Sequence, residues 1–195
     1  MATCEGKLSK NFVRDCSYRP KANLKNTAYL INTSDIDKAV SQLSANKMSV
    51  TTLALAAAAK IYSADGAGKY PQGNTEMVKA DNGNGWKHGF TVRILYYGEE
   101  QREQLQEMVD NGRVTVIAEK KDGGLAGELT YEILGYESGM AVQSVTWNSS
   151  ENDGVVEIVL GTEDDELEAT DRKIFMDTDL ATTQTWIETN TYVAA

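Results

Sequence analysis

From residue 86 onward the chain falls into short runs of alternating apolar and polar residues, separated by turns that contain glycine. Two of these runs carry apolar residues at every second position, namely Phe90, Val92, Ile94 and Val156, Ile158, Leu160. Alternation with a period of two places the apolar side chains on one face of a β-strand. The turn Lys121-Asp122-Gly123-Gly124 suits a tight hairpin, because Asp-Gly tolerates positive φ. This part of the chain therefore predicts a meander of strands.

The stretch 99–111 is the strongest helix candidate. It consists of good helix formers, has acidic residues in its first turn and is followed by Gly112. Its apolar stripe is narrow and consists of Leu105, Met108 and Val109. A narrow stripe is typical of a helix that lies on a surface or at a contact between subunits. We therefore predict a flanking helix whose three apolar residues are candidate contacts between subunits.

The first half of the chain gives weaker patterns. Residues 26–31 and 48–55 favour strands, and apolar residues at helical spacing predict a short helix over 34–44. Residues 63–85 are rich in Gly, Asp and Asn, and they predict a long loop that holds at most a short strand at 75–80.

These elements together predict a mainly β protein, a β-sandwich or barrel with a flanking helix. Residues 1–25 show no clear period, and we expect them to form an N-terminal arm. Residues 26–195 then form a single β-rich domain, of which 166–195 is a C-terminal extension. Within it, residues 173–195 hold apolar residues such as Trp186, so we expect them to pack on another part of the protein.

Charge is distributed unevenly along a chain whose net charge is −10. Residues 1–60 carry nine Lys/Arg and four Asp/Glu, whereas residues 151–195 carry two Lys/Arg and twelve Asp/Glu. A basic front and an acidic back could form complementary surfaces on neighbouring subunits. Charge that is scattered for solubility is the alternative. The candidate contacts between subunits are, besides the three helix residues, Lys7, Lys10, Phe12, Arg14, Tyr18, Arg19, Asp164, Asp165 and Glu166.

Few residues could carry catalysis or hold a metal. His88 is the only histidine and has no nucleophile motif beside it, so we expect a structural or surface role. Cys4 and Cys16 cannot complete a four-ligand zinc site with a single histidine, and we expect reduced thiols.

Two further motifs fail on spacing. The sequence Gly66-Ala67-Gly68-Lys69 lacks both the first glycine and the final Ser/Thr of a phosphate-binding loop. The acidic run 163–166 lacks the spacing and the central glycine of a calcium loop. We therefore expect no catalytic residue, no cofactor and no metal site, and predict that the protein is not an enzyme.

Three stretches in the middle of the chain resemble a known family. They are Gly-Trp-Lys-His-Gly-Phe at 85–90, Gly-Glu-Leu-Thr-Tyr-Glu-Ile-Leu-Gly-Tyr-Glu-Ser-Gly at 127–139, and Gly-Val-Val-Glu-Ile-Val-Leu-Gly at 154–161. In this order they resemble structural proteins of bacteriophages that infect Bacteroidetes-type bacteria. Over residues 45–165 the chain is similar to the tail-tube fold of tail tubes, tail terminators and neck or ring proteins.

The resemblance implies a non-enzymatic virion subunit that assembles with copies of itself into a ring or tube of the tail or neck. It further implies contacts with neighbouring tail or neck proteins, DNA that passes through the lumen without specific binding, and assembly in the bacterial cytoplasm. No membrane is expected, because the longest apolar run, Leu53–Ala59, is far shorter than the ~20 residues that span a bilayer. A monomeric β-sandwich that binds carbohydrate or peptide and a small hydrolase with an unrecognised site remain as alternatives.

Overall fold

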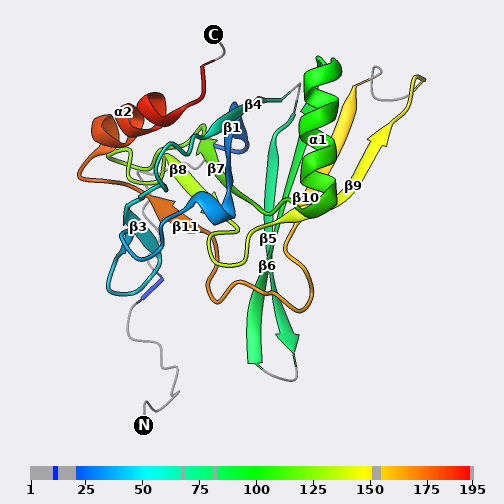
Figure 1. Ribbon diagram of the computed structural model, residues 1–195. Helices are drawn as coiled ribbons and strands as arrows, with labels where there is room; N and C mark the ends of the chain where they lie inside the picture. The colour runs from blue at the N-terminus through cyan, green and yellow to red at the C-terminus, as the bar shows by residue number, and fades with distance from the viewer. Residues whose placement is uncertain (1–10, 13–20, 67–68, 81–82, 151–154, 194–195) are drawn as a thin grey trace.

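The computed structural model describes residues 11–12, 21–66, 69–80, 83–150 and 155–193. These residues form a mainly β protein with two sheets and two α-helices, which confirms the predicted fold class (Figure 1). Most of the expected N-terminal arm lies outside the described residues. The arm also ends earlier than predicted, because the first strand begins at Leu24 and Lys25 pairs with Glu119 at 2.6 Å.

The larger sheet has seven strands in the order β2-β3-β11-β8-β7-β1-β4. Its strands are β1 (Leu24–Asn32), β2 (Gln42–Leu43), β3 (Ser49–Thr52), β4 (Tyr62–Asp65), β7 (Val114–Lys120), β8 (Tyr131–Leu134) and β11 (Lys173–Phe175). Neighbours run antiparallel except β3 and β11, which are parallel.

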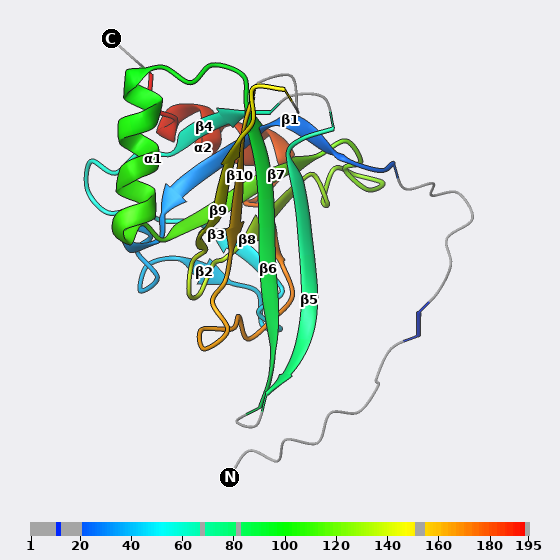
Figure 2. The same cartoon turned by 90° about the vertical axis from the view of Figure 1, so that its right-hand side faces the viewer.

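The smaller sheet has four strands in the order β5-β6-β10-β9, and every neighbouring pair is antiparallel. Its strands are β5 (Gln72–Ala80), β6 (Gly83–Ile94), β9 (Ala141–Trp147) and β10 (Val156–Gly161). Strands β5 and β6 form a long hairpin that projects well beyond the rest of the molecule (Figures 1 and 2).

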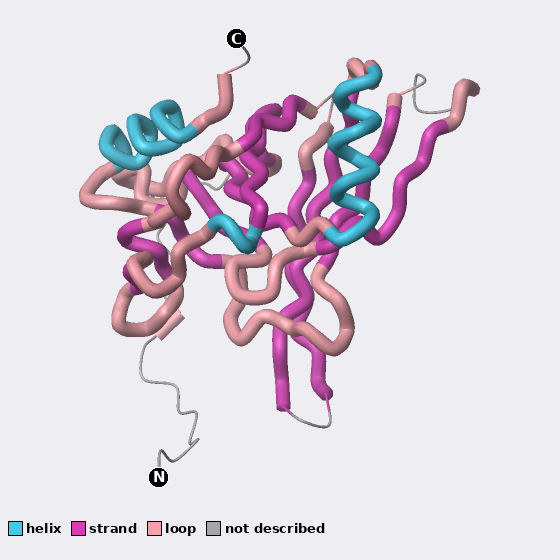
Figure 3. Tube along the Cα trace, viewed as in Figure 1, coloured by secondary structure: helices cyan, strands magenta, loops and turns pink. Residues whose placement is uncertain are grey.

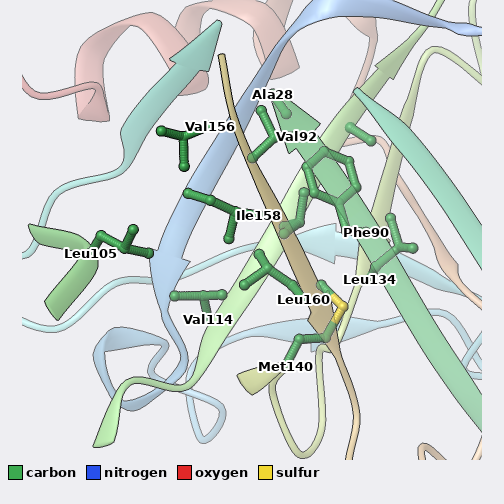
Figure 4. Packing of buried hydrophobic residues seen from close by; sticks show 12 residues of the cluster. Ala28, Phe90, Val92, Leu105, Val114, Leu134, Met140, Val156, Ile158 and Leu160 are labelled. Carbon is green, nitrogen blue, oxygen red and sulfur yellow. The ribbon is translucent and has the colours of Figure 1, made fainter. Parts of the chain in front are cut away.

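Strand β7 lies at the centre of the fold, and its residues Val114–Glu119 are buried on both faces. On one face Val116 joins a core between the two sheets, together with Phe90 and Ile158 (Figure 4). On the other face Ile117 joins a second core with Phe175 and residues of the C-terminal helix. The larger sheet is therefore the middle layer of the molecule.

The helix predicted at 99–111 is present as α1 (Glu99–Asn111). The side-chain oxygen of Gln101 accepts a hydrogen bond from the Gly98 amide at 3.0 Å, which caps the start of the helix. Gly112 follows it as expected. A second helix, α2 (Leu180–Asn190), is capped by Asp179, whose side chain accepts a hydrogen bond from the Thr182 amide at 2.7 Å.

Two predictions for local structure are wrong. The short helix expected over 34–44 is only a 3-10 turn at Thr33–Asp35, because Asp37 accepts hydrogen bonds from Ala39 N and Val40 N and closes a turn instead. The long loop expected at 63–85 is mostly strand: β4, β5 and the start of β6 occupy it (Figure 3). Only the part of β5 at 75–80 was expected as a strand, because an exposed hairpin needs no apolar alternation.

The C-terminal extension is an integral part of the fold. Strand β11 lies inside the larger sheet between β3 and β8, and α2 covers the second core with Ile187 and Trp186. The Trp186 ring meets Phe175 edge-on at 5.3 Å. The expectation that residues 173–195 pack on another part of the protein is confirmed for the described residues up to 193.

Candidate assembly interface

The two sheets differ in the length of their open edges. The larger sheet ends in β2, with two residues, and β4, with four residues, whereas the smaller sheet ends in β9, with seven residues, and β5, with nine. An edge strand presents a row of backbone N–H and C=O groups that can pair with another chain. Both edges of the smaller sheet are therefore candidate surfaces for assembly.

The direction of these edge strands is compatible with repeated joining. Because the smaller sheet is antiparallel throughout and contains an even number of strands, β5 and β9 run in opposite directions. A second copy in the same orientation would place its β5 antiparallel to β9 of the first. The sheet could thus continue from copy to copy without any change in strand polarity.

The outer face of the smaller sheet is polar. Phe90 and Val92 point inward to the core, and the strand register places the alternate side chains on the outer face. The outward-facing residues include Gln72, Asn74, Glu76, Lys87, Thr91, Arg93, Ser144, Thr146 and Glu157. Arg93 Nε donates a hydrogen bond to Glu157 at 2.7 Å, and the Arg93 guanidinium lies 4.1 Å from the centre of the Tyr70 ring. Among these described residues, two basic side chains balance two acidic ones.

One end of the smaller sheet exposes large apolar side chains. Trp147 is 65% exposed, and it lies opposite Val156, which in turn pairs with Ile94. Leu95 and Tyr96 follow Ile94 directly and are 70% and 75% exposed. Exposed apolar groups at a common end of a sheet are typical of surfaces that contact other proteins.

The predicted helix contacts separate into different environments. Leu105 is only 6% exposed and belongs to the core between the sheets, so its assignment to a subunit contact is wrong. The apolar stripe of α1 is narrow because the helix contacts the core through only Leu105 and, in part, Met108. Met108 packs partly against the same core, and Val109 is exposed.

The charged candidates have mixed outcomes. Asp164 forms an ion pair with Lys87, and Glu166 pairs with Arg113 at 3.0 Å, so these two acids already have partners within the subunit. Asp165 is exposed. Of the candidates in the arm, Phe12 is exposed, whereas Lys7, Lys10, Arg14, Tyr18 and Arg19 lie outside the described residues.

A buried polar junction, which the sequence patterns did not predict, joins the two sheets. The segment 162–172, here called the strap, connects β10 to β11 and runs beside the hairpin (Figures 1 and 2). Glu168 of the strap is fully buried, and its carboxylate accepts hydrogen bonds from the backbone N–H groups of Glu137 and Ser138 at 2.8–3.0 Å. Burial raises the pKa of this carboxyl, while the two N–H groups oppose the rise.

The neighbouring buried cation is Lys173. Its ammonium group lies 3.1 Å from the Glu137 carboxylate and donates to the Lys47 carbonyl and to Thr170. A buried charge is tolerated when it is paired and hydrogen-bonded in this way. The buried charges of the cluster are therefore satisfied within the subunit, and the Glu137 side chain alone among these three is partly exposed, at 32%.

His88 lies in the same junction and not on the surface. It is 3% exposed, and Nδ1 accepts a hydrogen bond from the Gly135 amide at 3.0 Å. Nε2 forms no hydrogen bond of good geometry, although the Thr170 backbone on that side favours the protonated ring. Burial is the largest influence and lowers the pKa of His88 to about 4. The geometry agrees with a structural role.

Other possible sites offer little chemistry. An open depression over α2 is lined by Asp177, Asp179, Ala181, Thr182, Thr185, Trp186, Thr189 and Asn190. Within the described part of the chain, no three His, Cys, Asp or Glu side chains are grouped so as to hold a metal ion. Gly66, from the sequence that partly matches a phosphate loop, donates its amide hydrogen to Asn26 O at 2.7 Å. Its N–H is therefore already bonded.

Neither helix among the described residues is long and apolar enough to cross a bilayer. No family model, curated protein or solved structure matches the chain. The candidate interface therefore depends on the geometry alone. Sequence reasoning missed the edges β5 and β9 and the alignment of Arg93 with Glu157. The polar alternation Thr91-Val92-Arg93 and Ser144-Val145-Thr146 is the pattern that could have indicated them.

Proposed function

We propose that the protein is a non-enzymatic structural subunit that joins copies of itself, edge to edge, into a closed ring or tube. The observation that carries the proposal is the pair of long open edges, β5 and β9, which run in opposite directions at the two sides of one sheet. Such edges rarely stay open in monomeric proteins, because they promote pairing with other chains. Closure into a ring through these strands would leave no edge of the smaller sheet unpaired.

The resemblance to phage tail-tube proteins gives this ring a place in a virion, as part of a tail or neck conduit for DNA. The polar outer face of the smaller sheet would line the lumen. Its described charges are balanced, so the face offers phosphate no array of cations to grip. The acidity of the chain lies elsewhere, for example in the exposed acids Glu100, Glu103 and Glu107 of α1.

Light scattering after size exclusion, together with electron microscopy, tests the proposal. The wild-type chain should form closed rings or tubes. A Val145→Lys substitution should block assembly, because a charge directed toward the inner side of an edge strand opposes pairing. Circular dichroism should remain that of the wild type. The matched control is Val40→Lys, at an exposed position outside both long edges, and it should assemble normally.

A wild-type chain that stays monomeric at all concentrations would contradict the proposal and would favour the monomeric binding module instead. Assembly of Val145→Lys into the same particles would show that β9 takes no part in the contact.

A further inference from the structure

The half of the β5–β6 hairpin that projects beyond the core is attached to the body through the strap. Trp86 N donates to Glu168 O at 2.8 Å, and Glu168 N donates to Trp86 O at 3.0 Å. Nearer the core, Thr162 N donates to His88 O at 2.9 Å, and the Thr162 hydroxyl oxygen accepts from His88 N at 3.1 Å. The strap also lies so close that a Cβ on Gly85 would come within 2.5 Å of Leu167 Cβ.

The His88 ring provides the side-chain link between this hairpin and the loop after β8. Because the Gly135 amide donates to Nδ1, that nitrogen must be unprotonated when the junction is closed. A protonated ring would carry a hydrogen on Nδ1, directed at the N–H of Gly135. Donor would then face donor in a site from which water is excluded. The closed junction therefore strongly disfavours an imidazolium ion.

The charged groups around His88 come from several segments. Asp171 of the strap favours protonation of the ring, whereas Arg172 of the strap and Lys173 of β11 disfavour it. Glu168 and Glu137 face the same junction from the strap and the β8–β9 loop. Burial outweighs these charges and gives His88 its pKa of about 4 in the closed junction. In water the ring returns toward its ordinary value of about 6.5.

We propose that His88 is an acid-sensitive catch: in mild acid its protonation releases the distal half of the hairpin from the strap while both hydrophobic cores stay folded. Phe90 and Val92 anchor the remainder of β6 in the core between the sheets, so the opening stops before them. If the proposed assembly through β5 is correct, acid would also loosen the ring, and this consequence rests on the proposed function. The catch itself is a property of the single subunit.

Native-state hydrogen exchange on the full chain tests the catch without any need for assembly. The reporters are the amides of Trp86, Gly135 and Thr162, and the reference is Ile117 in the centre of β7. After correction for intrinsic exchange, opening at the reporters should increase about 30-fold between pH 7.5 and pH 5, which follows from the two pKa values of His88. The Ile117 amide should keep its protection. Equal opening at both pH values, or a parallel loss of protection at Ile117, would overturn the proposal.

Two variants assign the response to the ring. In His88→Asn the side-chain oxygen can still accept from the Gly135 amide but cannot titrate, so opening should not increase as the pH falls. His88→Gln offers the same acceptor on a longer side chain and serves if the asparagine variant is too unstable. Both variants retain Glu168, whose raised pKa acts in the opposite direction, so they also control for that group. If both variants open in acid as the wild type does, His88 is not the catch.

Discussion

Arg93 and Glu157 lie directly opposite each other on β6 and β10, and the Arg93 Nε–Glu157 Oε2 distance is 2.7 Å. Their side chains are about one quarter exposed, so solvent screens the pair less than it would a free surface pair. The pair crosses the middle of the face that would line the lumen. It therefore fixes two charges that would otherwise be available to ligands.

We expect Glu157→Gln to lower the free energy of unfolding by about 0.5–1 kcal/mol, because the guanidinium loses its charged partner. Urea denaturation measures this change, and a double-mutant cycle with Arg93→Gln isolates the coupling between the two side chains. Glu76→Gln, an exposed acid on the same face, is the control and should be nearly neutral. A coupling free energy of zero would show that the ion pair does not stabilise the folded protein.

Phe90→Ala should destabilise the protein by about 3–5 kcal/mol, because it removes a fully buried ring from the core between the sheets. Leu95→Ala lies five residues away on the same segment but at an exposed position, and its effect should stay within about 0.5 kcal/mol. Thermal and chemical unfolding of both variants measure the difference. Similar losses for the two would mean that the smaller sheet does not pack on β7 as described.

Glu168→Gln should change the pH dependence of stability in a defined direction. The pKa of Glu168 is raised by burial, so the native state binds this proton more readily than the unfolded chain does. The stabilisation that the protonated Glu168 side chain contributes to the free energy of unfolding is therefore fully present below its ordinary pKa. It is lost as pH rises through the raised pKa of the folded state. The glutamine side chain cannot ionise, so the free energy of unfolding of the variant should increase relative to that of the wild type as pH rises across that window. Urea denaturation from pH 4 to pH 8 measures this, with exposed Asp165→Asn as the control that follows the wild type.

Deletion of residues 2–20 should leave a folded protein, because the first strand begins at Leu24. The deleted segment carries Lys7, Lys10, Arg14 and Arg19 against Glu5 and Asp15. If it contacts an acidic surface of another copy, the truncated chain should associate more weakly at low salt, and its association should depend less on salt. Light scattering over a range of salt concentrations measures both effects. The Debye length falls from ~10 Å at 0.1 M salt to ~3 Å at 1 M salt, so contacts between exposed charges weaken over that range. Unchanged association would assign the basic segment to solubility.

The sequence could predict the parts of the fold in which burial of one face makes apolar residues recur at a regular spacing. The strands around Phe90 and Ile158 are apolar at every second position because one face meets the core, and α1 is marked by its acids and by Gly112. Strand β5 was expected only as a short strand at 75–80, because its side chains are mostly exposed and so follow no apolar pattern. Helix α2 is rich in threonine, which is a weak helix former, and packing against the second core stabilises it.

The candidate interface and the junction were harder to predict for a different reason. The burial of Glu168 depends on amide groups of Glu137 and Ser138, some thirty positions away in the chain. His88 could be recognised as structural, because no catalytic motif accompanies it, but its partner Gly135 lies 47 positions away in the sequence. Edge strands are defined by the order of strands in a sheet, and a single sequence does not contain that order.

The position of β11 has a consequence for biosynthesis. The pair β2–β3 reaches the rest of the larger sheet only through β11, whose residues Lys173–Phe175 are made long after Ser49–Thr52. While the chain is still being translated, this pair has no neighbouring strand to join, and the second core lacks Phe175 and Ile187. Contacts across such a long stretch of chain form slowly. The β2–β3 pair therefore cannot join the larger sheet on the ribosome until residue 175 has emerged, so the middle layer of the molecule is completed from its far edge only after most of its other strands have been made.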